Sequence, residues 1–294
     1  MRLADIYYLI WEKLRTHCLL CVQKRKGYGS FQTIINECSV NLLEQYTDNP
    51  SSDIDEHYKN YYISKLVNEH AFQAQFTFES IKEIVKGNNT GADRPFVIVD
   101  IGDSAGSHLK YQRKLLAGMI DDVRTISVNL DPAAVDRIRK GGGEAVLCRA
   151  EDYRPDGLDV DVYLSYEMVE HLHNPAIFFY KLAKSNNGRF MVVTVPYRKH
   201  SRVAVDNSMN HTNYDTITAE NEHIFELSPK DWKRLLWHSG WKIRSEDIYY
   251  QYPRHSPLTP LYARIWDMND FEGFYAMFLE RDMSAANKYS DWED

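Results

Sequence analysis

The sequence lacks three features that would place it in a specialised class of protein. Its 294 residues include four cysteines, too few to form a disulfide framework in a chain of this length. No run of 18 apolar residues occurs, and the N-terminal apolar segment is interrupted by Asp5, Glu12 and Lys13. The net charge of -7 is not that of a chain built to attract nucleic acid. We therefore expect a cytoplasmic protein with no membrane span and a partner other than nucleic acid.

The sequence otherwise has the composition of an ordinary globular protein. Hydrophobic residues make up 44% of it and charged residues 26%, and its length allows one large domain with an extension. One short motif, Cys18-x-x-Cys21, could form half of a zinc site. No second pair of cysteines follows it, so we interpret both residues as packing residues of a helix.

The segment from Phe96 to His108 organises the rest of the chain. A run of β-branched and aromatic side chains from Phe96 ends in an acid, Asp100, and a loop containing Gly102 and Gly106 follows. This pattern predicts a buried parallel strand that turns directly into a helix. Glycine adopts positive φ without strain and lets a ligand lie against the backbone, so the segment is interpreted as a nucleotide-binding turn.

The charge of this turn separates two classes of ligand. Asp100 and Asp103 would repel the pyrophosphate of a dinucleotide, and the spacing of the glycines is not G-x-G-x-x-G. The same carboxylates could hold a cationic ligand, such as the amino group and sulfonium of S-adenosylmethionine. An ordinary connection between a strand and a helix remains the alternative for this motif alone.

Three further strand units follow, at residues 126–132, 144–152 and 160–172. In this order the units resemble the class I S-adenosylmethionine-dependent methyltransferases, over roughly residues 96–283. The resemblance implies an α/β fold with a Rossmann-like, doubly wound, mostly parallel seven-stranded sheet. It adds a C-terminal antiparallel strand and an N-terminal helical extension. The implied domains are a helical extension or substrate cap (1–91), the S-adenosylmethionine-binding methyltransferase domain (92–283) and a polar tail (284–294).

The resemblance also implies a set of cofactor contacts at the ends of successive strands. Asn129 stands where the family usually has an acid for the ribose hydroxyls, and Ser104 stands where it often has glycine. An amide can still accept one hydroxyl hydrogen bond, and Asp131 could substitute for it. The full set implied for the cofactor is Asp100, Gly102, Asp103, Ser104, Gly106, Asn129, Leu130, Ala150, Glu151, Asp152 and Glu167.

Two histidines, His171 and His223, are the candidates for a base that takes a proton from the acceptor. A second interpretation uses the motif E-x-x-E-H at residues 167–171. Together with His223, Glu167, Glu170 and His171 resemble the metal-binding set of small-RNA 2′-O-methyltransferases. The first three also resemble ubiquinone-pathway O-methyltransferases. The same motif occurs in metal-free relatives, so the divalent metal stays an alternative.

The segment from Tyr197 to Asn221 is polar and has little periodicity, and we interpret it as a lid over the acceptor. The function expected from the resemblance is an S-adenosylmethionine-dependent O-methyltransferase with a small-molecule or sugar-containing (glycan) acceptor. Two alternatives remain open. One is a metal-dependent RNA or quinone-type O-methyltransferase, and the other is a catalytically silent binding module with the same fold.

Overall fold

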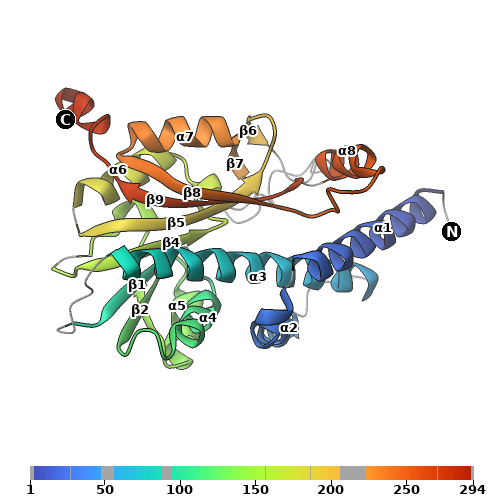
Figure 1. Cartoon of the computed structure of the whole chain (residues 1–294), viewed down its shortest axis with the longest axis horizontal. Helices are drawn as coiled ribbons and strands as arrows, with labels where there is room; N and C mark the ends of the chain where they lie inside the picture. Colours follow the sequence, from blue (N-terminus) through green and yellow to red (C-terminus); the bar gives the residue numbers. More distant parts are fainter. Residues whose placement is uncertain are drawn as a thin grey trace. The chain divides into compact units, whose positions relative to one another are not determined.

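The structure is a computed structural model that describes residues 3–26, 28–47, 56–87, 94–155, 157–185, 187–205, 223–269 and 271–292 (Figure 1). The chain divides into two compact units. One comprises Met1–Gln75 and Tyr249–Phe274, and the other comprises Phe76–Ile248 and Tyr275–Asp294. The domain division predicted at residues 91 and 283 stays a prediction.

The first unit is helical. It contains α1 (Leu3–Arg25), α2 (Gln32–Thr47), the first part of α3 (Glu56–Gly87) and α8 (Thr259–Asn269). Cys18 and Leu19 of α1 pack with Tyr252 and Trp266 in a small apolar core. Asn68 Nδ2 donates a hydrogen bond to the Leu19 carbonyl oxygen at 3.1 Å. Cys18 is thus a buried helical side chain, as predicted.

The second unit is built on a seven-stranded sheet. In spatial order its strands are β3 (Glu144–Leu147), β2 (Val123–Asn129), β1 (Phe96–Ile101), β4 (Val160–Tyr166), β5 (Gly188–Tyr197), β9 (Gly273–Arg281) and β8 (Trp241–Tyr250). Strands β1 to β5 are parallel. Arg189 at the start of β5 donates from Nε to Glu280 near the end of β9 at 2.8 Å, as an antiparallel neighbour requires. This order confirms the predicted Rossmann-like fold class.

Besides the end of α3, the described helices that flank the sheet are α4 (Ser107–Leu116), α5 (Pro132–Lys140), α6 (Pro175–Ser185) and α7 (Pro229–His238). Local sequence explains where they begin. Asp131 caps α5 by accepting hydrogen bonds from the Ala133 and Ala134 N–H groups, and Pro132 occupies the first turn. Ser228 caps α7 in the same way.

The buried faces of the strands follow from their alternation. On β1, Val97, Val99 and Ile101 belong to the core that includes Phe178 of α6 and Trp232 of α7. The intervening Phe96 and Ile98 pack instead with residues of α4 and of the end of α3. Because alternate side chains of a strand point to opposite faces, an unbroken apolar strand needs helices on both faces. Figure 1 shows α6 and α7 above the sheet and α4 and α5 below it.

The predicted lid contains regular structure that the sequence analysis missed. Residues Arg202–Val205 within it form strand β6, which pairs in a two-stranded antiparallel sheet with β7 (His223–Glu226), just beyond the predicted lid. Arg202 lies opposite Glu226, and Val205 lies opposite His223. Residues 206–221 of the predicted lid lie outside the described residues. A short pair of strands was not predicted because neither segment alternates over enough residues.

Within the described ranges, no helix is both long enough and apolar enough to cross a membrane.

Candidate functional site

The predicted site residues follow β1, β2, β3 and β4. These strands are parallel neighbours, with Asp100 in register with Ser127 of β2 and with Leu164 of β4. The carboxyl ends of parallel strands lie at one edge of a sheet, where open α/β folds bind their ligands. The turn at 102–106, the segment 129–131, the turn at 150–152 and the segment 167–171 therefore share that edge.

The carboxylate of Asp103 organises the turn after β1. Its Oδ1 accepts hydrogen bonds from the N–H groups of Ala105 at 3.1 Å and Gly106 at 2.7 Å. Its Oδ2 accepts a hydrogen bond from the Ser127 hydroxyl at 2.7 Å. Asp103 therefore fixes the shape of the loop with both oxygens, a use that the resemblance did not imply.

Gly102 permits a close contact between the ends of β1 and β4. Its φ is 99°, and a β-carbon there would lie 2.6 Å from Met168 Cγ. The space in front of this glycine, which the sequence analysis assigned to a ligand, is filled by the Met168 side chain. Gly106 has a φ of 72° and ordinary packing distances of 3.7 Å to Ile138. Both glycines are needed for backbone conformation.

Asp100 is the buried acid of the site, with 1% of its surface exposed. Burial, and secondarily the charge of Asp103, raises the pKa of Asp100 well above its usual value. Within the described part of the chain, its Oδ2 has no hydrogen-bond partner. One nitrogen of His108 and a carboxylate oxygen from each of Asp100 and Asp103 lie within 4.8 Å of one another. A carboxyl group in this state either keeps its proton or meets a cation.

Asn129 joins β2 to the turn after β1. Its Nδ2 donates to the Asp103 carbonyl oxygen at 2.9 Å, and its Oδ1 accepts from the Asp131 N–H at 2.8 Å. Asp131 in turn accepts from the first N–H groups of α5. Leu130 between them is 62% exposed. An amide oxygen has two lone pairs, so Asn129 can still accept one hydroxyl hydrogen bond.

The end of β3 forms a short 3-10 turn, Ala150–Asp152. Glu151 is half-buried, with an oxygen 3.6 Å from a guanidinium nitrogen of Arg149. Asp152 and Ser104 are exposed. These residues can meet a ligand at the same edge of the sheet as the turn after β1.

The end of β4 has unusual backbone and side-chain environments. Glu167 has a φ of 46°, which is uncommon for a residue other than glycine, and its N–H donates to the Thr194 carbonyl oxygen at 3.0 Å. Glu170 is fully buried, and its carboxylate oxygens have no hydrogen-bond partner among the described residues. Burial raises the pKa of Glu170 to about 7, although the nearby His223 opposes the shift.

The two predicted histidines lie together beside Glu170. The rings of His171 and His223 have centroids 4.7 Å apart in an edge-to-face arrangement. One donor atom from each of Glu170, His171 and His223 lies within 4.8 Å of the other two. Three of the four residues named for a metal thus converge, and Glu167 is not among the group. The same set can place an imidazole as a general base.

Three charged residues that the sequence analysis did not name support His223. Its Nδ1 lies 2.9 Å from Glu226 Oε1, and Glu226 Oε2 lies 3.0 Å from Arg198 Nε and 2.6 Å from Arg202 Nη2. Residues three apart on a regular strand point to opposite faces, so the spacing of His223 and Glu226 did not predict contact. The pairing of Arg202 with Glu226 depends on the register of β6 and β7.

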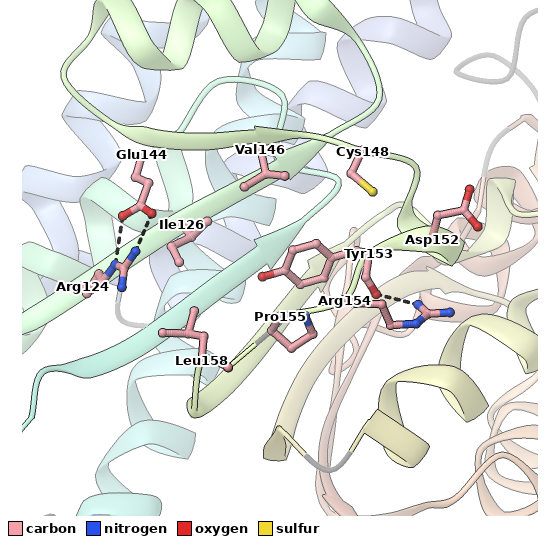
Figure 2. A pocket seen from close by; sticks show the side chains of 11 residues that line it. Arg124, Ile126, Glu144, Val146, Cys148, Asp152, Tyr153, Arg154, Pro155 and Leu158 are labelled. Carbon is pink, nitrogen blue, oxygen red and sulfur yellow. Dashed lines mark hydrogen bonds and ion pairs between the residues drawn. The ribbon is translucent and has the colours of Figure 1, made fainter.

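A separate cavity of about 590 Å³ lies over β2 and β3. Ile126, Val146 and Tyr153 line it, and Figure 2 shows the Arg124–Glu144 ion pair at one end, with Asp152 and Arg154 at the other. The described part of the connection from β3 to β4 holds only the turn Ala150–Asp152, which leaves this part of the sheet without a covering helix. Asp152 is the residue that this cavity shares with the predicted cofactor set.

Comparison with known proteins gives matches in structure only. No family model matches the chain, and no curated protein sequence matches it. The Burkholderia thailandensis 1,6-didemethyltoxoflavin-N1-methyltransferase, with 1,6-didemethyltoxoflavin and S-adenosylhomocysteine bound, is 14% identical. That match covers 73% of this chain and 90% of the other, with a TM-score of 0.44.

Two further solved structures are similar at the same level. A protein described as a sarcosine dimethylglycine methyltransferase from Galdieria sulphuraria is 11% identical, with 74% of this chain and 85% of the other covered and a TM-score of 0.49. The [4+2]-cyclase SpnF is 11% identical, with 83% and 93% covered and a TM-score of 0.49. Proteins of different activities share this level of similarity, so it assigns no function to this chain.

Proposed function

We propose that this protein is an S-adenosylmethionine-dependent methyltransferase that methylates an oxygen of a small-molecule or sugar-containing acceptor. One observation carries the proposal. The turn after β1, with its buried Asp100, and the cluster of Glu170, His171 and His223 after β4 follow neighbouring parallel strands and share one edge of the sheet. A cofactor site and a proton acceptor at that shared edge are what methyl transfer to a hydroxyl requires.

The residues at this edge fit a cationic cofactor. The buried Asp100 Oδ2, which has no hydrogen-bond partner in the described structure, suits the amino group of a methionine moiety. Asn129 retains a lone pair for a ribose hydroxyl, and Glu151 can accept hydrogen bonds from an exocyclic amino group. S-adenosylmethionine, when bound, would supply a methyl group activated by a sulfonium. Asp103 contributes by holding the loop in shape.

The transfer step needs a base at the acceptor. With S-adenosylmethionine held by Asp100, Asn129 and Glu151, its methyl carbon would pass from the sulfur to the acceptor oxygen, and S-adenosylhomocysteine would leave. The hydroxyl proton goes to an imidazole nitrogen of His223 or His171. Neutral imidazole is suited to this role because its ordinary pKa lies near neutrality. The rings lie 4.7 Å apart, so one acceptor can lie against both.

A second candidate function has its own supporting observation. Glu170, His171 and His223 present one oxygen and two nitrogen donors within 4.8 Å of one another. A divalent cation held there would lower the pKa of an acceptor hydroxyl or diol and so replace the base. This arrangement would suit a metal-dependent O-methyltransferase, including one that acts on RNA or a quinone precursor. The chain's net charge of -7 disfavours RNA among these acceptors.

We also place the protein in the cytoplasm. All four cysteines are free thiols, and Cys18 and Cys38 are buried. This supports a reducing compartment, where thiols persist without pairing.

The proposal is tested by binding and turnover measurements on the full chain. Calorimetry with S-adenosylhomocysteine is expected to show one site per chain, weakened roughly tenfold by Glu151→Ala through the loss of one hydrogen bond. Asp159→Asn, a change at an exposed acid just before β4, is the control and leaves the affinity unchanged. Absence of binding to the unmodified protein would contradict the proposed cofactor.

Turnover separates an enzyme from a binding module. The protein is incubated with methyl-labelled S-adenosylmethionine and a panel of phenols, sugars, nucleosides and short RNAs, and the products are analysed by mass spectrometry. Label on an acceptor oxygen supports the proposal. Binding of the cofactor without label transfer to any acceptor in the panel supports the catalytically silent module instead.

A further inference from the structure

Glu226 connects two arginines to the histidine of the site. Its side chain is almost fully buried, with 1% of the residue exposed. Arg198 is 2% exposed and its Nε forms an ion pair with Oε2 of the carboxylate at 3.0 Å, and Arg202 donates to the same oxygen at 2.6 Å. Oε1, the other oxygen, faces His223 Nδ1 at 2.9 Å. The arginines and the histidine thus meet different oxygens of one carboxylate.

These contacts restrict the protonation of His223. A carboxylate paired with two guanidinium groups is ionised, and an ionised carboxylate only accepts hydrogen bonds. The short contact between Glu226 Oε1 and His223 Nδ1 therefore requires that Nδ1 carry the proton. In a neutral imidazole only one nitrogen is protonated, so the lone pair of His223 is on Nε2.

We propose that Glu226 is a positioning residue that fixes His223 in the tautomer whose lone pair is on Nε2. The use of this tautomer in the site rests on the proposed function. Glu226 has the same positioning role whether His223 acts as a base or as a metal ligand. A base must accept a proton on a nitrogen with a lone pair, and a metal must bind to one. Since Nδ1 is engaged with Glu226, Nε2 is the nitrogen that serves the cluster with Glu170 and His171.

An isosteric substitution can reverse the tautomer. In Glu226→Gln, the new side chain has one acceptor oxygen and one NH2 group of donors. Arg198 and Arg202 can only donate, so the amide oxygen turns toward them. The NH2 group then faces His223 Nδ1, which must accept. The imidazole proton moves to Nε2, and the lone pair is lost from the side of the ring that serves the cluster.

The tautomer is measured directly by nitrogen-15 NMR of histidine-labelled protein at about pH 8, where an ordinary imidazole is neutral. The His223 signals are assigned by their loss in His223→Gln. The unmodified protein is expected to show Nδ1 protonated and Nε2 unprotonated, and Glu226→Gln is expected to show the reverse. Methyl transfer in this variant should fall by about 10- to 100-fold.

Glu280→Gln is the matched control. Glu280 is also a carboxylate held by two arginines, since Arg189 donates to Oε1 at 2.8 Å and Arg244 donates to Oε2 at 3.0 Å, but these contacts are far in sequence from the histidines. This control is expected to leave the His223 signals and the turnover unchanged.

The outcomes separate this inference from the proposed function. An unmodified protein with Nε2 of His223 protonated would overturn the inference, and that measurement does not require Glu226→Gln to fold. A folded Glu226→Gln protein with an unchanged tautomer would also overturn it. If the protein binds no S-adenosylhomocysteine but shows the expected tautomers, the proposed function fails and the positioning role of Glu226 stands.

Discussion

Asn129 donates a hydrogen bond from Nδ2 to the Asp103 carbonyl oxygen at 2.9 Å, and so links the end of β2 to the turn after β1. The contact gives the Asn129 amide a structural role in the turn after β1. The resemblance placed an acid at this position to bind ribose hydroxyls, but an acid cannot make this bond because a carboxylate has no hydrogen to donate. The amide is thus suited to the loop of this chain as well as to a ligand.

This contact predicts the effect of restoring the acid. Asn129→Asp would place a carboxylate oxygen against the Asp103 carbonyl, so we expect the free energy of unfolding to fall by about 1 to 3 kcal/mol. Urea denaturation measures the change. The control is Asn174→Asp, because among the described residues the Asn174 side chain uses only its Oδ1, as acceptor for the Ile177 N–H, and aspartate keeps that acceptor. Equal stability of Asn129→Asp and the unmodified protein would show that the bond contributes nothing.

The contact of Gly102 with Met168 makes a second prediction. Gly102→Ala is expected to destabilise the protein by the cost of positive φ, roughly 1 to 2 kcal/mol, and by an overpacking cost of about 1 to 3 kcal/mol. Gly118→Ala is the control, since Gly118 has a φ of 82° with nothing within 4 Å of the added β-carbon. The midpoint temperature of thermal unfolding should be well below that of Gly118→Ala in the Gly102→Ala variant.

A double variant distinguishes the two costs at Gly102. Met168→Ala removes Cγ, which lies 2.6 Å from the added β-carbon, and keeps Cβ at 2.9 Å, so it should recover part of the stability lost in Gly102→Ala. Additive losses in the double variant would contradict the steric explanation.

Cofactor binding should release a proton if Asp100 meets a cationic group. Burial raises the pKa of Asp100 in the free protein, and a bound ammonium would lower it again. Affinity for S-adenosylhomocysteine should therefore increase with pH until the free carboxyl is ionised. Calorimetry in two buffers with different ionisation enthalpies measures the proton directly. Asp100→Asn should bind the cofactor without releasing a proton. If the binding enthalpy of the unmodified protein does not depend on the buffer, the cationic group binds away from Asp100.

Glu170 should make stability depend on pH. Its pKa rises from 4.5 to about 7 on burial, so the folded state binds more protons than the unfolded state between these values. Stability contributed by protonated Glu170 is present below about pH 4.5 and is lost as the pH rises through 7. In the presence of a chelator, Glu170→Gln should therefore gain stability relative to the unmodified protein, on the order of 2 to 3 kcal/mol by pH 8.

A control of opposite sign is provided by Glu144, whose pKa is lowered by its hydrogen bond to Arg124. Glu144→Gln should lose stability relative to the unmodified protein as the pH rises through the acid range. Replacing the chelator with a divalent cation tests the second candidate function. A bound metal would favour the charged carboxylate of Glu170 and remove the loss of stability near pH 7, whereas an unchanged pH dependence would favour the histidine base.

The strands and the edge of the sheet where the site lies could be predicted from the sequence. Runs such as Phe96–Ile101 bury both faces, which only a covered parallel strand allows, and parallel strands bring residues at their carboxyl ends together wherever they stand in the chain. The resemblance implied that Asp100, Asn129, Glu151 and Glu170, far apart in sequence, lie at the ends of successive strands, and the parallel order of these strands brings those ends to one edge. The starts of α5 at Pro132 and of α7 at Pro229 could also be predicted from the sequence, because helix capping depends on adjacent residues.

The tertiary structure alone decided how those side chains are used. Asp103 and Asn129 bond to the loop itself, Met168 fills the space in front of Gly102, and Glu226 bonds to His223 across a strand end. The Asn129 and Met168 contacts join separate elements, so their partners are set by the distance between elements and by strand register, which local spacing does not encode. The sequence determined which edge of the sheet carries the candidate site residues. Packing determined which of their polar atoms are used inside the protein and which remain for a ligand.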